Sequence, residues 1–184
     1  MSNAIQEVLL GRRTIHFYKS EPLPEGALER ALEAGVHAPN HKLTNPWRFT
    51  IVGPEVRAAL TEVGVELKCG DGADEARIAK VRAKLSAPPV LVVVSQAIDA
   101  DAFRRREDYA AIACAIQNMS LSLWAEGVGS KWSSGSITRA AQTYELLEID
   151  EQVEEIVGFF WAGFPEIVPK VMPRDRGVVT RETR

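Results

Sequence analysis

Cysteine is scarce in this sequence. The 184 residues include 2 cysteines, Cys69 and Cys114, which form neither a CxxC pair nor a regularly spaced framework. A small fold held together by disulfides is therefore not indicated. This use of cysteine fits a reducing compartment, and we expect a cytoplasmic protein.

Long hydrophobic runs are also missing. The longest apolar stretches, residues 88–94 and 156–164, are shorter than the about 20 residues that a membrane-spanning helix needs. The first residues contain no secretory hydrophobic region, because a glutamate, a glycine and two arginines interrupt them within positions 7–13. We therefore expect a soluble protein with no membrane partner.

An excess of positive charge is absent as well. The formal net charge is -3 and the isoelectric point is near 5.7, so we expect no nucleic-acid partner. The hydrophobic fraction of 46% and the charged fraction of 26% are ordinary for a globular protein. A length of 184 residues suits one domain with a substantial core, or two very small ones.

Several familiar motifs do not occur. The sequence has no GxGxxG or GxxxxGK[ST] phosphate loop and no GxSxG nucleophile elbow. His37 and His41 are spaced like a helical metal-binding pair, but Pro39 breaks the helix between them and no third ligand is evident. We expect no metal site, and no residue stands out as a catalytic acid, base or nucleophile.

The sequence does contain a mixed series of helical and strand patterns. Apolar spacing predicts helices over residues 5–10, 25–37, 54–68, 74–85, 107–126 and 138–147, and strands over residues 47–52, 89–94 and 154–164. The last two strands are continuously apolar, which is typical of strands covered on both faces. Because the order is not a strict βαβ alternation, we expect an α+β sheet flanked by helices.

Three segments between or beyond these elements differ from them. Residues 12–24 are basic and then punctuated by proline, which predicts a connector, and residues 127–135 predict a Gly/Ser-rich loop around one strand-like turn. Residues 165–184 form an extended tail that cannot build its own core. The tail is expected to be disordered or to pack across a neighbour.

The helix predicted over residues 107–126 is apolar almost all the way round. A helix without a broad polar face is buried on more than one side. The chain's own sheet can cover one side, and this favours a second copy of the chain on the other. A central helix of a monomer is the alternative.

Arg12, Arg13 and Thr14 form a dense set of hydrogen-bond donors directly after the first helix. Arginine binds phosphate and carboxylate groups in a bidentate manner, so these residues are candidates for an anion site. On spacing alone, a solvated basic turn is the favoured interpretation. His16 would lie on the same side of an extended chain as Thr14. There it could donate a hydrogen bond to a polar ring edge, or it could simply lie on the surface.

Two further polar segments are candidates for ligand binding. His41 and Asn45 lie in a loop bounded by Pro39 and Pro46, and the Asn45 amide suits a ring edge with alternating C=O and N–H groups. Small residues around Trp132 would let a ligand approach the backbone, while the indole offers a flat apolar surface. The alternative for the first loop is an ordinary capping and turn loop. Arg174 and Arg176 in the tail are a further candidate pair, but a solvated charge run is the favoured interpretation there.

Taken in order, four motifs resemble those of the nitroreductase family of FMN-dependent oxidoreductases. They are Arg12-Arg13-Thr14 followed by Phe17 and Pro22, Ala38-Pro39-Asn40 leading to Asn45-Pro46-Trp47-Arg48-Phe49, Ala115–Met119 leading to Glu126–Gly129, and Gly158 through Gly163-Phe164-Pro165. The loop around His41 and the turn Trp132–Gly135 are most similar to a short branch of NAD(P)H nitroreductases. The resemblance covers most of the chain.

The resemblance implies a single nitroreductase-like domain over residues 1–184, with residues 165–184 as its tail. Its fold would be α+β, with a central mixed or antiparallel sheet and FMN at a homodimer interface. His41 and Asn45 would approach the FMN from one subunit. The other subunit would contribute Arg12, Arg13, Thr14, His16, Trp132, Ser133, Ser134, Arg174 and Arg176.

The implied activity is an oxidoreductase reaction in which NADH or NADPH passes a hydride to the flavin. A nitroaromatic or quinone-like small molecule would then accept it at the same place, in a ping-pong cycle. The alternatives are a non-enzymatic FMN-binding, storage or sensor dimer, and a dehalogenase or flavin-fragmenting enzyme on the same scaffold.

Overall fold

The structure is a computed structural model, which describes residues 3–174 and 180. Within them a sheet of four strands has the order β1-β2-β4-β3, and every neighbouring pair is antiparallel. The strands are β1 (Trp47–Ile51), β2 (Val90–Ala97), β3 (Gly129–Ser133) and β4 (Glu154–Gly163). The antiparallel sheet and the helices around it confirm the α+β prediction.

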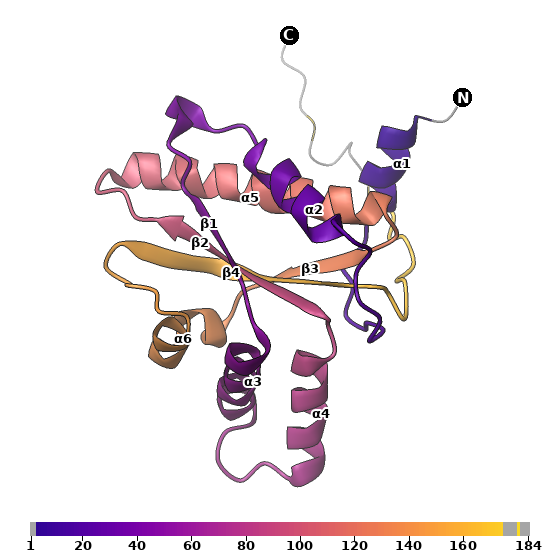
Figure 1. The fold of residues 1–184 in the computed structure, drawn as a ribbon, viewed down its shortest axis with the longest axis vertical. Helices are drawn as coiled ribbons and strands as arrows, with labels where there is room; N and C mark the ends of the chain where they lie inside the picture. Colours follow the sequence, from indigo (N-terminus) through magenta and orange to yellow (C-terminus); the bar gives the residue numbers. More distant parts are fainter. Residues whose placement is uncertain (1–2, 175–179, 181–184) are drawn as a thin grey trace.

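Helices cover both faces of this sheet (Figure 1). On one face lie α1 (Ala4–Gly11), α2 (Ala27–Val36) and α5 (Ala102–Ala125). On the other lie α3 (Pro54–Cys69), α4 (Glu75–Ser86) and α6 (Ala141–Leu146). Short 3-10 turns occur at His41–Leu43 (η1) and Ser136–Arg139 (η2).

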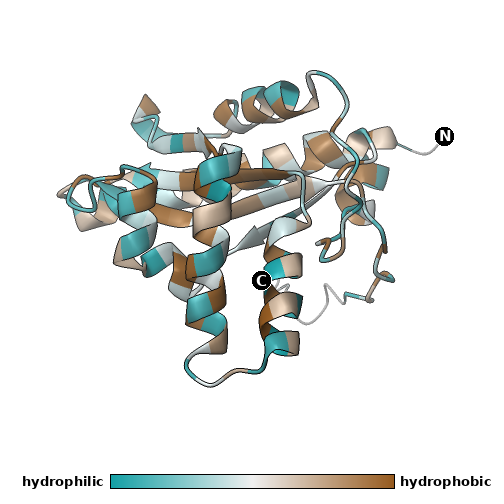
Figure 2. Cartoon of the chain, turned by 60° about the horizontal axis from the view of Figure 1, so that its bottom comes forward, coloured by the Kyte–Doolittle hydropathy of each residue, from teal (hydrophilic) through white to brown (hydrophobic). Residues whose placement is uncertain are grey.

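The two central strands divide their side chains between two cores. In β2, Val92 and Val94 pack with α2 and α5, whereas Leu91 and Val93 pack with residues of α3 and α6. Successive side chains of a strand point to opposite faces, so a strand covered on both sides is apolar throughout. Figure 2 shows the result as brown segments along the sheet, with teal mixed into the surrounding helices. The prediction for these strands is confirmed.

Helix α5 begins at Ala102, earlier than the predicted start at residue 107. The cap is Asp101, whose Oδ1 accepts hydrogen bonds from the backbone N–H groups of Phe103 (2.8 Å) and Arg104 (3.5 Å). The charged residues of the first turns carry no apolar period, so the pattern alone placed the start too late. The longer helix brings Glu107 and Asp108 into its second turn.

Two other expectations need correction. Residues 129–133 form a strand paired with β4 rather than a loop around one turn, because this pairing depends on a partner distant in sequence. The helix predicted over residues 138–147 is divided into η2 and α6 at Ala140, whose backbone is extended (φ -77, ψ 132). No helix in the described part of the chain is long and apolar enough to cross a membrane.

Candidate functional site

The segment that carries the candidate arginines is fixed to the edge strand of the sheet. Thr14 forms a parallel bridge with Ser130 of β3, and the backbone N–H of Ile15 donates to the Ser130 carbonyl at 3.0 Å. The Ile15 side chain is fully buried. These contacts hold residues 12–14 beside β3, the edge strand of the sheet.

A cavity of about 200 Å³ lies where this segment, α5 and β3 meet, and we call it the arginine cavity. Its polar and aromatic lining residues are Arg12, Thr14, Gln117, Ser120, Ser130 and Trp132. The fold thus brings together Arg12, Thr14 and Trp132, which the sequence analysis had singled out in separate segments. Gln117 and Ser120 were missed, because they are ordinary positions in the pattern of an apolar helix.

Positive charge accumulates at this cavity without a matching acid. Burial, followed by the charges of Arg174 and Arg13, lowers the pKa of Arg12. Within residues 3–174, no carboxylate forms an ion pair with any of these three arginines. Guanidiniums that repel one another are stabilised by an anion placed among them.

Arg13 supplies a more specific sign of an anion site. Its Nη1 donates to the carbonyls of Leu10 (2.8 Å) and Arg12 (2.6 Å), which holds the guanidinium in place. Its Nε and Nη2 are buried and have no hydrogen-bond partner among the residues that the structure describes. A buried donor of a charged group costs free energy when it is unpaired. Arg12 lines the arginine cavity and Arg13 does not, so Arg13 would add its charge from behind Arg12. The charges of the two residues together fit the phosphate end of FMN.

The other residues of this region point in different directions. Trp132 is 38% exposed, and its ring centroid lies 6.5 Å from that of Tyr109 on α5. Ser133 accepts a hydrogen bond from Trp161 Nε1 at 2.8 Å, and Ser134 is exposed. Arg174 is exposed but is near enough to affect Arg12, and Arg176 lies outside the described residues.

The loop at residues 40–45 is held in an unusual backbone conformation. Lys42, Leu43 and Asn45 have positive φ angles of 58°, 53° and 48°. Such angles are uncommon for residues other than glycine and persist where the surroundings enforce them. Here the backbone N–H of Asn45 donates to Asn40 Oδ1 at 2.7 Å.

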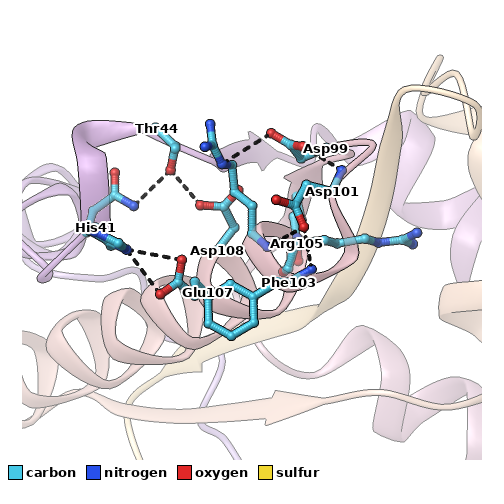
Figure 3. Close-up of polar contacts among 11 residues, drawn as sticks. His41, Thr44, Asp99, Asp101, Phe103, Arg105, Glu107 and Asp108 are labelled. Atoms are coloured by element: carbon cyan, nitrogen blue, oxygen red, sulfur yellow. Dashed lines mark hydrogen bonds and ion pairs between the residues drawn. The ribbon is translucent and has the colours of Figure 1, made fainter.

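A network of side chains connects this loop to α5 (Figure 3). Asn40 Nδ2 donates to Thr44 Oγ1 at 2.9 Å, and Thr44 Oγ1 donates to Asp108 Oδ1 at 2.5 Å. Asp108 is buried, with 4% of its surface exposed. His41 Nδ1 lies 3.0 Å from Glu107 Oε1 and forms an ion pair when the imidazole is protonated. These contacts hold the loop against the second turn of α5.

His41 and Asn45 themselves lie on the outside of this loop. Both are exposed, and Asn45 Nδ2 donates to the Leu43 carbonyl at 3.1 Å. Neither residue lines the arginine cavity of its own chain. Their expected role at the cofactor therefore needs the loop of a second copy, as the sequence analysis supposed.

His16 and Thr14 line different cavities, so they do not share a side as the extended pattern predicted, and the expected contact of His16 with FMN stays a prediction. His16 lines a second cavity of about 360 Å³ together with Lys68, Lys84 and Lys131, and we call this the lysine cavity. The chain leaves β3 after Ile15 and forms its next bridge between Tyr18 and Pro165, so it does not continue as a regular strand. Burial, followed by the charges of Lys131 and Lys84, lowers the pKa of His16.

Large apolar side chains remain exposed on three segments of the chain. In α1 they are Ile5, Leu9 and Leu10, in α5 Phe103 and Tyr109, and after β4 Ile167, Val168, Val171 and Met172. Exposed apolar surface of this extent marks interaction sites. No group of three or more metal-ligating side chains occurs among the residues that the structure describes.

Comparison with known proteins agrees with this arrangement. The chain is 32% identical over 163 residues to the "Putative NAD(P)H nitroreductase YdjA" of Escherichia coli K12, covering 88% of each chain. The fold matches a nitroreductase-like family protein from Bacillus cereus with a TM-score of 0.87 and 23% identity, over 100% of this chain and 97% of the other.

A second solved structure with the same fold contains the cofactor. It is a nitroreductase with bound FMN from Bacteroides fragilis, with a TM-score of 0.76 and 21% identity, over 99% of this chain and 100% of the other. The family model described as "Nitroreductase family" matches residues 9–164. The chain belongs to the nitroreductase family.

Proposed function

We propose that this protein is an FMN-dependent oxidoreductase that passes a hydride from NADH or NADPH, through the flavin, to a small nitroaromatic or quinone-like acceptor. The observation that carries the proposal is the pair of buried, unpartnered guanidinium nitrogens of Arg13 beside Arg12. They offer charged donors to a phosphate in a family whose solved members include one with bound FMN.

In this proposal the candidate residues in and around the arginine cavity share the binding of FMN. Arg12 and Arg13 neutralise the FMN phosphate, and the Thr14 hydroxyl donates a further hydrogen bond. Trp132 supplies a flat apolar wall, with Ser133 and Ser134 following it along the same edge. Arg174 adds positive charge near Arg12, and Arg176 is proposed as a further phosphate contact. The bound flavin would supply the redox chemistry.

A homodimer is part of the proposal, because one chain offers too little of a site. The arginine cavity has about 200 Å³, whereas small-molecule sites have about 300–1,000 Å³. In a dimer, the exposed loop with His41 and Asn45 would complete the cavity of the partner. The exposed apolar residues of α1, α5 and the segment after β4 would be covered, and residues 165–184 would lie across the second copy as the tail of one domain.

The test begins with the absorbance spectrum and the molar mass of the freshly purified protein. We expect flavin absorbance, a dimeric mass by light scattering, and oxidation of NADH or NADPH when menadione or a nitrofuran is added. Bound FMN without turnover would support a storage or sensor protein instead. A colourless monomer that does not take up added FMN would contradict the proposal.

A further inference from the structure

A hydrogen bond between Trp161 and Ser133 joins two neighbouring strands of the sheet. Trp161 lies in β4, Ser133 is the last residue of β3, and the indole Nε1 donates to Ser133 Oγ at 2.8 Å. An indole nitrogen can only donate, whereas a hydroxyl can both donate and accept. The direction of this bond is therefore fixed, and the Ser133 oxygen is its acceptor.

The hydrogen of the Ser133 hydroxyl consequently points elsewhere. No acceptor for it occurs among the residues that the structure describes. The outer edge of β3 has backbone contacts with Thr14 and Ile15 at Ser130, and the described residues provide none at Ser133. Ser133 is only half-buried, so its hydroxyl is a free donor at the end of the strand whose Ser130 and Trp132 line the arginine cavity.

The indole that donates to this hydroxyl is held firmly. Trp161 is buried, with 5% of its surface exposed, and Phe159 meets its ring edge to face at 5.8 Å between centroids. Arg57 of α3 places its guanidinium carbon 4.8 Å from the centroid of the same ring. The guanidinium is fixed in turn, because it donates to the carbonyls of Leu85 (2.7 Å) and Pro88 (3.0 Å). The indole N–H therefore keeps its direction.

Two cations over the indole make it a stronger donor. Besides Arg57, Lys131 places its Nζ 5.7 Å from the Trp161 centroid. Burial lowers the pKa of Arg57 to about 10, which leaves the guanidinium charged at neutral pH. A positive charge over the ring attracts its π electrons and makes the N–H more positive. Hydrogen bonds in series polarise one another, so the Ser133 O–H becomes a stronger donor as well.

We propose that Trp161 is a positioning residue that directs the Ser133 hydroxyl to donate a hydrogen bond to the flavin ring, and so favours the reduced form of FMN. The inference rests on the proposed function, in which Ser133 follows Trp132 along the FMN. The ring of reduced FMN carries an additional negative charge, and a donor stabilises a charged acceptor more than a neutral one. Ser133 contacts the cofactor, whereas Trp161 and Arg57 act through Ser133.

The midpoint potential of the bound FMN tests the proposal without any substrate, by titration with dithionite in the presence of redox dyes. In Ser133→Ala we expect the preference for reduced over oxidised FMN to fall about tenfold, as for the loss of a charge-assisted hydrogen bond. For a two-electron couple this lowers the potential by about 30 mV. Ser133→Thr retains a hydroxyl and should restore most of the wild-type potential.

Trp161→Phe keeps an aromatic ring but removes the N–H that directs the hydroxyl. We expect the preference for reduced FMN to fall about threefold, because the freed hydroxyl can also turn away from the flavin. In Ser133→Ala/Trp161→Phe the potential should equal that of Ser133→Ala, since Trp161 acts only through the hydroxyl. Ser20→Ala is the control, because Ser20 is exposed and lines neither cavity, and it should leave the potential unchanged.

These measurements separate the inference from the proposed function. An unchanged potential in Ser133→Ala, or a further fall in the double variant, would overturn the inference, and reduction of the bound FMN by NADH or NADPH would still support the proposed function. The expected shifts in a protein whose FMN neither nicotinamide reduces would support the inference and contradict the proposed function. A protein that takes up no FMN would contradict both.

Discussion

The arginine cavity and the lysine cavity lie on opposite faces of β3, and both concentrate positive charge. Next to the first, backbone carbonyls hold Arg13, and two of its buried nitrogens have no partner within the described part of the chain. In the second, Lys68 and Lys84 are exposed, so water screens their charge. Fixed, partly buried donors suit a group that stays bound, and screened lysines suit a ligand that exchanges.

The largest expected effect breaks the arginine side of this contrast. Arg12→Ala should weaken FMN binding by about 1.5–3 kcal/mol, or roughly 10- to 150-fold, because the phosphate loses a charge-assisted contact. Fluorescence titration of the apoprotein with FMN measures this. Arg139→Ala, on the exposed η2 turn, is the control and should bind FMN normally. Wild-type affinity in Arg12→Ala would show that the phosphate binds elsewhere.

Gly158→Ala should damage the arginine side through packing. A Cβ at this buried position of β4 would collide with the Trp132 indole nitrogen and lie 3.0 Å from the Ser133 carbonyl oxygen. Overpacking of this kind typically costs about 1–3 kcal/mol, which urea unfolding would measure. Gly53→Ala, where a Cβ meets nothing within 4 Å, provides a control, and equal losses in both would contradict the packing argument.

The loop at residues 40–45 offers a smaller perturbation. Asp108→Ala removes the buried acceptor of the Thr44 hydroxyl, and we expect a loss of about 1–2 kcal/mol in the free energy of unfolding. FMN affinity should fall as well, since this loop would complete the partner's arginine cavity. Glu107→Gln alters only the exposed contact with His41 and should cost less than about 1 kcal/mol. A larger loss of unfolding free energy in Glu107→Gln than in Asp108→Ala would contradict this prediction.

The smallest expected effect concerns the helices that carry Lys68 and Lys84. Glu62 of α3 accepts hydrogen bonds from Arg82 Nε and Nη2 of α4, both at 2.7 Å, and these bonds lower the pKa of Glu62. A lowered carboxylate pKa stabilises the folded state above the unfolded value of about 4.3, and this stability is lost as pH falls through the folded pKa.

The difference in melting temperature between the wild type and Glu62→Gln should therefore be present at neutral pH and shrink towards acid. Both side chains are exposed, so the effect should be small and should decrease at high salt. A difference that grows as the pH is lowered would show that the ion pair does not link α3 and α4.

Sequence patterns determined much of the architecture because they report burial along one segment at a time. The continuous apolar runs of β2 and β4 predicted strands covered on both faces, and both cores are observed. The sequence also predicted that Arg12, Arg13 and Thr14 lie close together, because they are consecutive. The all-round apolar pattern of α5 predicted cover on a second side. Tyr109 of this helix is exposed in the single chain, and the second copy stays a prediction.

Only the tertiary structure decided which distant residues meet. The bridge between Thr14 and Ser130 of β3 brings Arg12 to the same cavity as Trp132. The chain then turns to its bridge at Tyr18, and His16 lines the other cavity. Lys68, Lys84 and Lys131 come from three elements, and none of them is distinguished by its neighbours in sequence. Periodic patterns record what each element buries, whereas the meeting of these charges depends on strand order and helix packing, which join segments far apart in the chain.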